Sequence, residues 1–357
     1  LLVIVFFTPL SINLEQMEFG LGLSLPTEPL MFGVMVIFFL RSFYERDFDA
    51  GILRHPVTIA IIINLVWLGF TIITSELRLV SFKHVIARLW FVVCFYFIGT
   101  QIFRFKKNIR HFFLLYLIPL AIVVVYTLIQ HAQRGFEEKP AHWVMQPFFK
   151  DHTSYGAILA MFFPITIGFF FSREITGIKK IFISVIFLII TVGLLFSYTR
   201  AAWISMLVAL GVFLIYFFRI RIHTLAIGFL LLLTLFLYFQ NDIIMGLEKN
   251  KQDSSTDLAE HAQSVTNIAS DASNLERINR WNCALRMFFE RPVFGWGPGT
   301  YQFLYSPYQH SSELTIISTK FGNRGNAHSE YLGPLAESGV FGALSFLAII
   351  ICVYYSA

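Results

Sequence analysis

Two arginines lie three residues apart in a long polar part of the chain, in "RINRWNCALRMFFE" (277–290). Arg277 and Arg280 would share one face of a helix, because residues three and four apart are neighbours on a helix surface. Two guanidinium groups on one face could bind one anion together, although a solvated helix surface has the same pattern. Trp281, one turn after Arg277, could cover a ligand or anchor the helix at a membrane surface, where tryptophan is enriched.

A third arginine, Arg200, lies in "FSYTRAAWIS" (196–205), between two apolar segments with almost no loop. The spacing predicts that Arg200 begins the second of two helices. A cation at a helix N-terminus opposes the helix dipole, and one bound anion would satisfy both the arginine and the exposed N–H groups. An arginine that extends its head to the membrane interface is the alternative. The position at a break in the membrane favours a functional residue.

A histidine, His328, opens the last apolar segment in "NAHSEYLGPLAESGVFG" (326–342). At about 100° per residue, Tyr331 and Gly339 would lie on the same side of a helix as His328, and Glu337 on the opposite side. We expect Gly339 to let a neighbouring helix approach closely. A histidine near a helix N-terminus stays neutral more readily, so its imidazole could accept a proton. An ordinary interfacial polar residue is the alternative.

Other polar groups indicate no metal or cofactor site. The histidines of the segment 131–153 lack the spacing of a zinc motif, and the three cysteines are scattered along the chain. The glycine cluster "GWGPG" (295–299) is not preceded by a strand, so it predicts a turn and not a nucleotide-binding loop.

These residues must be positioned by membrane helices. The 357 residues are 56% hydrophobic and only 14% charged, whereas soluble proteins average about 25% charged residues. A soluble fold is therefore excluded. Runs such as "LAIGFLLLLTLFLYF" (225–239) are apolar on every face and lack the alternation of a barrel strand. The fold class that follows is all-α, a polytopic transmembrane helix bundle.

A membrane span needs about 20 residues, and the sequence has about ten candidate segments. They are a shortened one at 1–13 and longer ones at 28–42, 56–75, 84–103, 111–130, 154–172, 180–199, 201–218, 223–241 and 330–356. Since the chain starts at Leu1 and stops within an apolar run, we expect the protein to continue beyond both ends.

The basic residues predict how the segments are oriented. The formal net charge of +5 comes mostly from short loops between segments, so it reports orientation and not a nucleic-acid partner. Alternate loops hold the larger share of Lys and Arg, which predicts that these loops are cytoplasmic. The resulting layout is a bundle over 1–241, an outward loop over 242–327, and a final transmembrane helix over 328–357 that carries His328. Within the loop, Ser273 and Glu276 have the spacing of a helix capping box.

Four stretches in this order resemble the signature regions of the O-antigen ligase and polymerase superfamily of bacterial envelope glycosyltransferases. They are "SYTRAAWIS", "RINRWNCAL", "RPVFGWGPGTY" and "HSEYLGPLAESGVFG", and the resemblance is strongest from about 190 to 345. His328 is followed by ten residues and Gly339, which is similar to the histidine motif of the ligases. Arg277 matches their loop arginine, but Trp281 stands where they often have leucine and Ser329 where asparagine is common.

The resemblance implies metal-independent, inverting transfer of a glycan from undecaprenyl diphosphate to an acceptor hydroxyl, such as that of lipid A-core. The reaction would take place on the periplasmic side of the bacterial inner membrane. In this interpretation Arg200 and Arg277 neutralise the leaving diphosphate and His328 is the base. The residues expected to bind substrate or lipid are Arg280, Trp281, Tyr331 and Gly339.

Three other functions stay open at this stage. A polymerase that extends the glycan, or an enzyme that attaches it to protein, would need the same donor chemistry. A transporter of lipid-linked oligosaccharide would also need cationic residues, but transporters usually gather charge around a cavity at the membrane midplane. Here the candidate residues lie at the outer face and in one large loop, which favours the enzyme.

Overall fold

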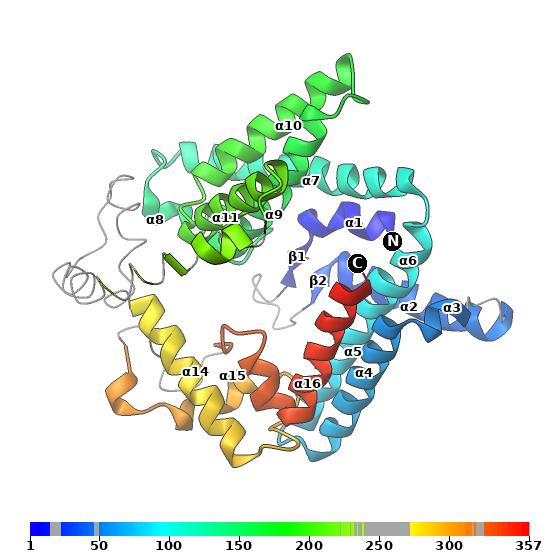
Figure 1. Cartoon of the computed structure of the whole chain (residues 1–357), viewed down its shortest axis with the longest axis vertical. Coiled ribbons are helices and arrows are strands. Elements are labelled where there is room, and N and C mark those ends of the chain that lie inside the picture. The colour runs from blue at the N-terminus through cyan, green and yellow to red at the C-terminus, as the bar shows by residue number, and fades with distance from the viewer. Residues whose placement is uncertain are drawn as a thin grey trace. The chain divides into compact units, whose positions relative to one another are not determined.

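The computed structural model describes residues 1–14, 23–45, 50–221, 272–315, 318 and 325–356, together with several positions between 223 and 238, and most of them are helical (Figure 1). Two-residue strands β1 (Ile12–Asn13) and β2 (Ser24–Leu25) pair antiparallel. The predicted all-α class is confirmed. The contacts group the chain into two units, one of residues 1–34, 97–246 and 253–266, the other of 35–96, 247–252 and 267–357.

The first unit is built around long apolar helices. They are α7 (Lys106–Ala132), α9 (His152–Phe171), α10 (Ile178–Leu195) and α11 (Arg200–Phe217), with shorter α1 (Leu2–Phe7), η1 (Thr8–Leu10), α6 (Ile98–Ile102) and α8 (Glu138–Ala141). Leu120, Tyr155 and Ile190, from α7, α9 and α10, are among the residues buried in its core. Helix α9 begins where the carboxylate of Asp151 accepts a hydrogen bond from Ser154 N at 2.8 Å.

The second unit holds the predicted loop arginines and the histidine. Its helices are α3 (Ala50–Arg54), α4 (Pro56–Thr74), α5 (Arg78–Phe91) with a π-helical continuation (Val92–Phe97), α14 (Ala272–Glu290), α15 (Tyr301–Leu304) and α16 (Leu332–Ser356), with 3-10 turns η4 (Ser306–Tyr308) and η5 (Ser311–Glu313). Helix α2 (Thr27–Glu45) begins in the first unit and ends in the second. Helices α4 and α16 pack side by side (Figure 1), and Trp67 Nε1 donates a hydrogen bond to Ser338 O at 2.8 Å.

Eight of the described helices are long and apolar enough to cross a membrane: Thr27–Tyr44, Pro56–Thr74, Arg78–Ile102, Lys106–Ala132, His152–Phe171, Ile178–Leu195, Arg200–Phe217 and Leu332–Ser356. The chain is therefore a multi-pass membrane protein. Of the other two predicted spans, 1–13 forms the six-residue helix α1, a 3-10 turn and the strand β1. Most of 223–241 lies outside the described residues, as does the polar run 248–271.

The last span is not one regular helix, because the backbone of Gly339 is non-helical with φ 69° and ψ −171°. The next residue, Val340, donates its N–H to Pro292 O at 2.9 Å. A Cβ at Gly339 would lie 2.0 Å from Val293 O. The segment that approaches Gly339 is thus the backbone that follows α14, and not the neighbouring helix that the sequence predicted. The predicted helical face from His328 to Gly339 is wrong as well, since regular helix starts at Leu332.

Substitution of Gly339 by alanine is expected to destabilise the protein by about 1–3 kcal/mol. Alanine rarely adopts the positive φ of this residue, and its Cβ would displace the backbone of Val293. The matched control is Gly69→Ala in α4, where an added Cβ meets nothing within 4 Å. That change should be neutral or slightly stabilising, since alanine favours a helix. Thermal unfolding of both variants in detergent measures the difference, and equal melting temperatures would contradict the role given to Gly339.

Candidate functional site

Helix α14 carries both predicted arginines, and the carboxylate of Glu276 holds one of them. Glu276 Oε1 accepts a hydrogen bond from Arg280 Nε at 2.9 Å, and the two side chains are only 4% and 12% exposed. Glu276 Oε2 accepts from Thr315 Oγ1 at 3.0 Å and from the hydroxyl of Ser318. Burial alone raises the pKa of Glu276, but the hydrogen bonds from Ser318, Arg280 and Thr315 outweigh it and leave the pKa lowered. Glu276 is therefore an anchoring anion.

The guanidinium of Arg280 reaches the predicted histidine. Its Nη1 lies 3.1 Å from His328 Nε2 and donates to Asn326 O at 3.2 Å, while its Cζ lies 5.7 Å from the centre of the Tyr305 ring. A guanidinium has only donors, so Nε2 must be the acceptor of this hydrogen bond. The contact therefore specifies a neutral imidazole with its proton on Nδ1.

The backbone around His328 fixes where the imidazole lies. His328 has a positive φ of 48°, and its N–H donates to Asn326 Oδ1 at 3.2 Å. Ser329 Oγ then accepts from Leu332 N at 3.1 Å, as an N-cap does, so Ser329 starts the first turn leading into α16. His328 thus stands just before a helix N-terminus, where its side chain remains exposed.

Although the side chain of His328 reaches the surface, its neighbours partly shield the imidazole from water, and this partial burial is the first cause that lowers the pKa of His328. The positive charges of Arg280 and Arg277 lower the pKa further, and Glu276 opposes them. A neutral imidazole was the sequence-based expectation. The structure gives the same direction and a more specific cause, because burial and two named guanidinium groups account for the shift.

The glycine cluster joins α14 to the kink in α16. Gly295, Gly297 and Gly299 all have positive φ, which confirms the predicted turn. Gly297 N donates to Glu337 O at 2.7 Å, and Tyr301 N donates to Glu337 Oε1 at 3.1 Å. The carboxylate of Glu337 therefore has a structural partner in the backbone that follows the glycine turn.

The remaining predicted residues lie around this centre or apart from it. Trp281 is 39% exposed, and exposed Tyr331 has its ring 6.2 Å from that of Phe346. Arg277 is exposed on α14. Arg200 is the first residue of α11, as predicted, but it belongs to the first unit. That Arg200 acts at the same site as His328 stays a prediction.

Two residues that matter here were missed by sequence reasoning. Glu276 was considered only as a capping residue, although its place four residues before Arg280 is the spacing of a helical ion pair. Helix α14 instead begins at Ala272, and the side chain of Ser273 lies outside the described residues. Arg88 lies inside the span Arg78–Ile102, and an arginine in an apolar segment is itself a functional signal.

Comparison with known proteins finds a family match over the part of the chain that contains Arg280 and His328. Residues 185–347 match a family model described as O-antigen ligase. A curated protein of Haemophilus influenzae, described as an uncharacterized protein, is 25% identical over 245 residues, which are 67% of this chain and 58% of that protein. The chain thus spans little more than half the length of this relative. No solved structure matches the chain.

Removal of the charge of Arg280 should raise the pKa of His328, because the guanidinium disfavours the imidazolium. In the parent protein the neutral imidazole then persists to lower pH than in Arg280→Gln. Acylation of histidine by diethyl pyrocarbonate, followed peptide by peptide with mass spectrometry, measures the neutral form as a function of pH. The pH below which acylation of His328 falls off should move to a higher value in Arg280→Gln, and by less in Arg277→Gln. An acylation–pH profile of His328 that is the same in both variants as in the parent would refute this electrostatic account.

Proposed function

We propose that this chain, whose residues 185–347 match the O-antigen ligase family model, transfers a glycan from a lipid-diphosphate donor to an acceptor hydroxyl. The donor of the proposal is undecaprenyl diphosphate-linked glycan, and the acceptor is a glycolipid such as lipid A-core. The observation that carries the proposal is the contact of Arg280 with the Nε2 atom of His328, at 3.1 Å. It joins a neutral base to a group that binds phosphate.

The proposed reaction is one in-line displacement. The acceptor oxygen forms a bond to the anomeric carbon, the bond from that carbon to the diphosphate oxygen breaks, and the configuration inverts. The acceptor proton passes to His328 Nε2, and the electron pair leaves with the diphosphate. Arg277 and Arg280 supply positive charge as that negative charge develops, and Arg200 is a third cation for the same task.

Donor binding would also release the base. In the structure the lone pair of His328 Nε2 accepts a hydrogen bond from Arg280, so it cannot take a proton at the same time. A phosphate oxygen is a stronger acceptor for a guanidinium than a neutral imidazole. Bound diphosphate would therefore draw Arg280 Nη1 away from Nε2, while Arg280 Nε stays on Glu276. The same arginine would then bind the donor and free the base.

The proposed location is the bacterial inner membrane, with the site on the periplasmic side. The eight spans support a multi-pass protein, and the unequal distribution of Lys and Arg between alternate loops supports the orientation. The acceptor separates a ligase from a polymerase or from an enzyme that glycosylates protein, so candidate acceptors are part of the test below.

His328→Ala should lower the rate of transfer by about 100- to 10,000-fold, which is the usual contribution of a general base. His310→Ala is the matched control, because His310 is an exposed histidine of the same unit. The assay gives the purified full-length protein a lipid-diphosphate-linked glycan with lipid A-core, a glycan chain or a protein as acceptor. If His328→Ala and Arg277→Ala transfer as fast as the parent, the assigned mechanism is wrong. Translocation of the donor without covalent transfer would instead indicate a transporter.

Chelation of divalent metals should leave the rate of transfer unchanged, since guanidinium groups provide the positive charge in this mechanism. The measurement compares initial rates with and without EDTA at constant ionic strength. A loss of activity that added Mg²⁺ or Mn²⁺ restores would contradict the proposed role of Arg277 and Arg280.

A further inference from the structure

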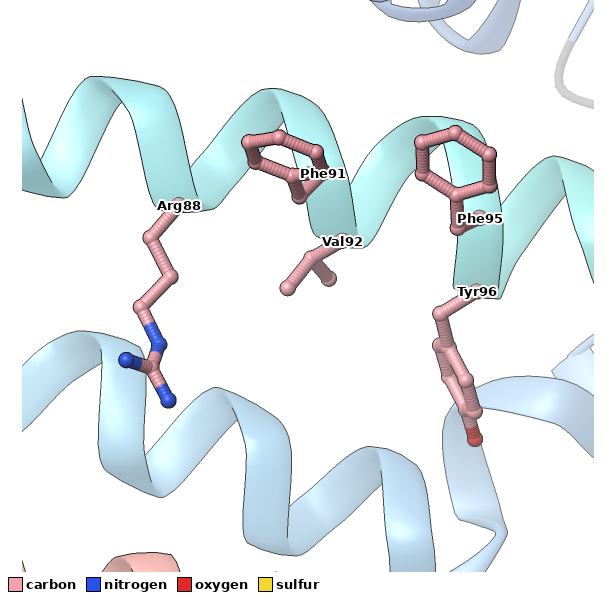
Figure 2. A pocket seen from close by; sticks show the side chains of 5 residues that line it. All are labelled: Arg88, Phe91, Val92, Phe95 and Tyr96. Carbon is pink, nitrogen blue, oxygen red and sulfur yellow. The ribbon is translucent and has the colours of Figure 1, made fainter. Parts of the chain in front are cut away.

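A second cationic site lies on α5, within the second unit. Arg88, Phe91, Val92, Phe95 and Tyr96 line a cavity of about 490 Å³, a size typical of small-molecule sites. Figure 2 shows Arg88, Val92 and Tyr96 extending from one side of the helix, with the rings of Phe91 and Phe95 beside them. The cavity is therefore apolar and aromatic, with one charged group at one end.

Arg88 is only partly satisfied by the protein. Its Cζ lies 5.9 Å from the centre of the Phe346 ring, and Glu330 and Glu337 act on it electrostatically. The side chain of Arg88 has no hydrogen bond or ion pair with any residue that the structure describes. A guanidinium in an apolar span is costly unless an anion or hydrogen-bond acceptor meets it. The missing acceptor indicates a ligand.

The opposite end of the cavity is held in shape by the protein. Tyr96 OH is hydrogen-bonded to Thr58 Oγ1 of α4 at 2.5 Å, and the rings of Phe91 and Phe95 stack with their centres 6.0 Å apart. Val92, Phe95 and Tyr96 belong to the π-helical turn Val92–Phe97. Such π-helical turns inside α-helices are frequent at functional sites.

The charge of the site selects the kind of anion. One guanidinium matches one negative charge, and the nearby carboxylates of Glu330 and Glu337 reduce the positive potential further. A diphosphate carries more charge than this site can neutralise. A phosphodiester with one net negative charge fits the arginine, and an acyl chain fits the aromatic walls.

We propose that Arg88 and the aromatic cavity of α5 bind an anionic membrane phospholipid, with its phosphodiester on Arg88 and an acyl chain along Phe91 and Phe95. The residues that line this cavity differ from those of the Arg280–His328 contact, and the proposal does not rest on the proposed transferase activity.

The test measures lipid binding to the purified full-length protein by native mass spectrometry in detergent. Phosphatidylglycerol should bind more tightly than phosphatidylcholine, and Arg88→Gln should weaken phosphatidylglycerol binding about tenfold and remove this preference. Lys83→Gln is the matched control, because Lys83 is an exposed cation on the same helix and its loss should change nothing. Phe95→Ala should weaken the binding of phosphatidylglycerol and of phosphatidylcholine by similar factors.

Three results would overturn the proposal. One is Arg88→Gln binding phosphatidylglycerol like the parent. Another is displacement of phosphatidylglycerol from the parent by an equal concentration of undecaprenyl diphosphate, which would assign the cavity to a diphosphate lipid. The third needs no variant and holds even if Arg88→Gln does not fold: phosphatidylglycerol raising the melting temperature of the parent no more than phosphatidylcholine does.

Discussion

The contact of two backbones at Gly339 is the constraint on which the candidate site depends. The segment Pro292–Val293 can approach the last span only because Gly339 has no Cβ, and the hydrogen bond from Val340 N to Pro292 O closes this contact. The glycine turn that follows lies against the same helix. Gly297 N donates a hydrogen bond to the carbonyl of Glu337, and Tyr301 N donates one to its carboxylate. Helix α14 is thereby fastened to α16, and Arg280 is brought to His328.

A series of polar contacts leads from the buried carboxylate of Glu276 to the exposed imidazole of His328. Thr315 and Ser318 hold the carboxylate of Glu276, Glu276 holds Arg280, and Arg280 meets the imidazole of His328. Each member restricts the next, so the exposed histidine is oriented by groups that are more deeply buried. An exposed side chain can be placed accurately in this way, because its position is set by neighbours that are less exposed than it is.

Hydropathy predicted the membrane helices because it is a local property, and the helix ends at Arg200 and Leu332 agree with that reading within a few residues. The geometry between His328 and Gly339 could not be predicted in the same way. Helical angles apply only to regular helix, and a tertiary contact with Val293 breaks the helix at Gly339. The hydroxyl partners of Glu276, Thr315 and Ser318, also come from about forty positions away, which no periodicity reveals. Arg88, in contrast, was missed although its signal is local, since it is a charge inside an apolar run.

The hydrogen bond between Arg280 and His328 Nε2 has a consequence for the order of events in the proposed transfer. An acceptor that enters the site first meets a histidine whose lone pair is already occupied, so its hydroxyl cannot be deprotonated. The diphosphate of the donor has the charge to draw the guanidinium away. Two-substrate kinetics would then be ordered, with the lipid-linked sugar binding before the molecule that receives it.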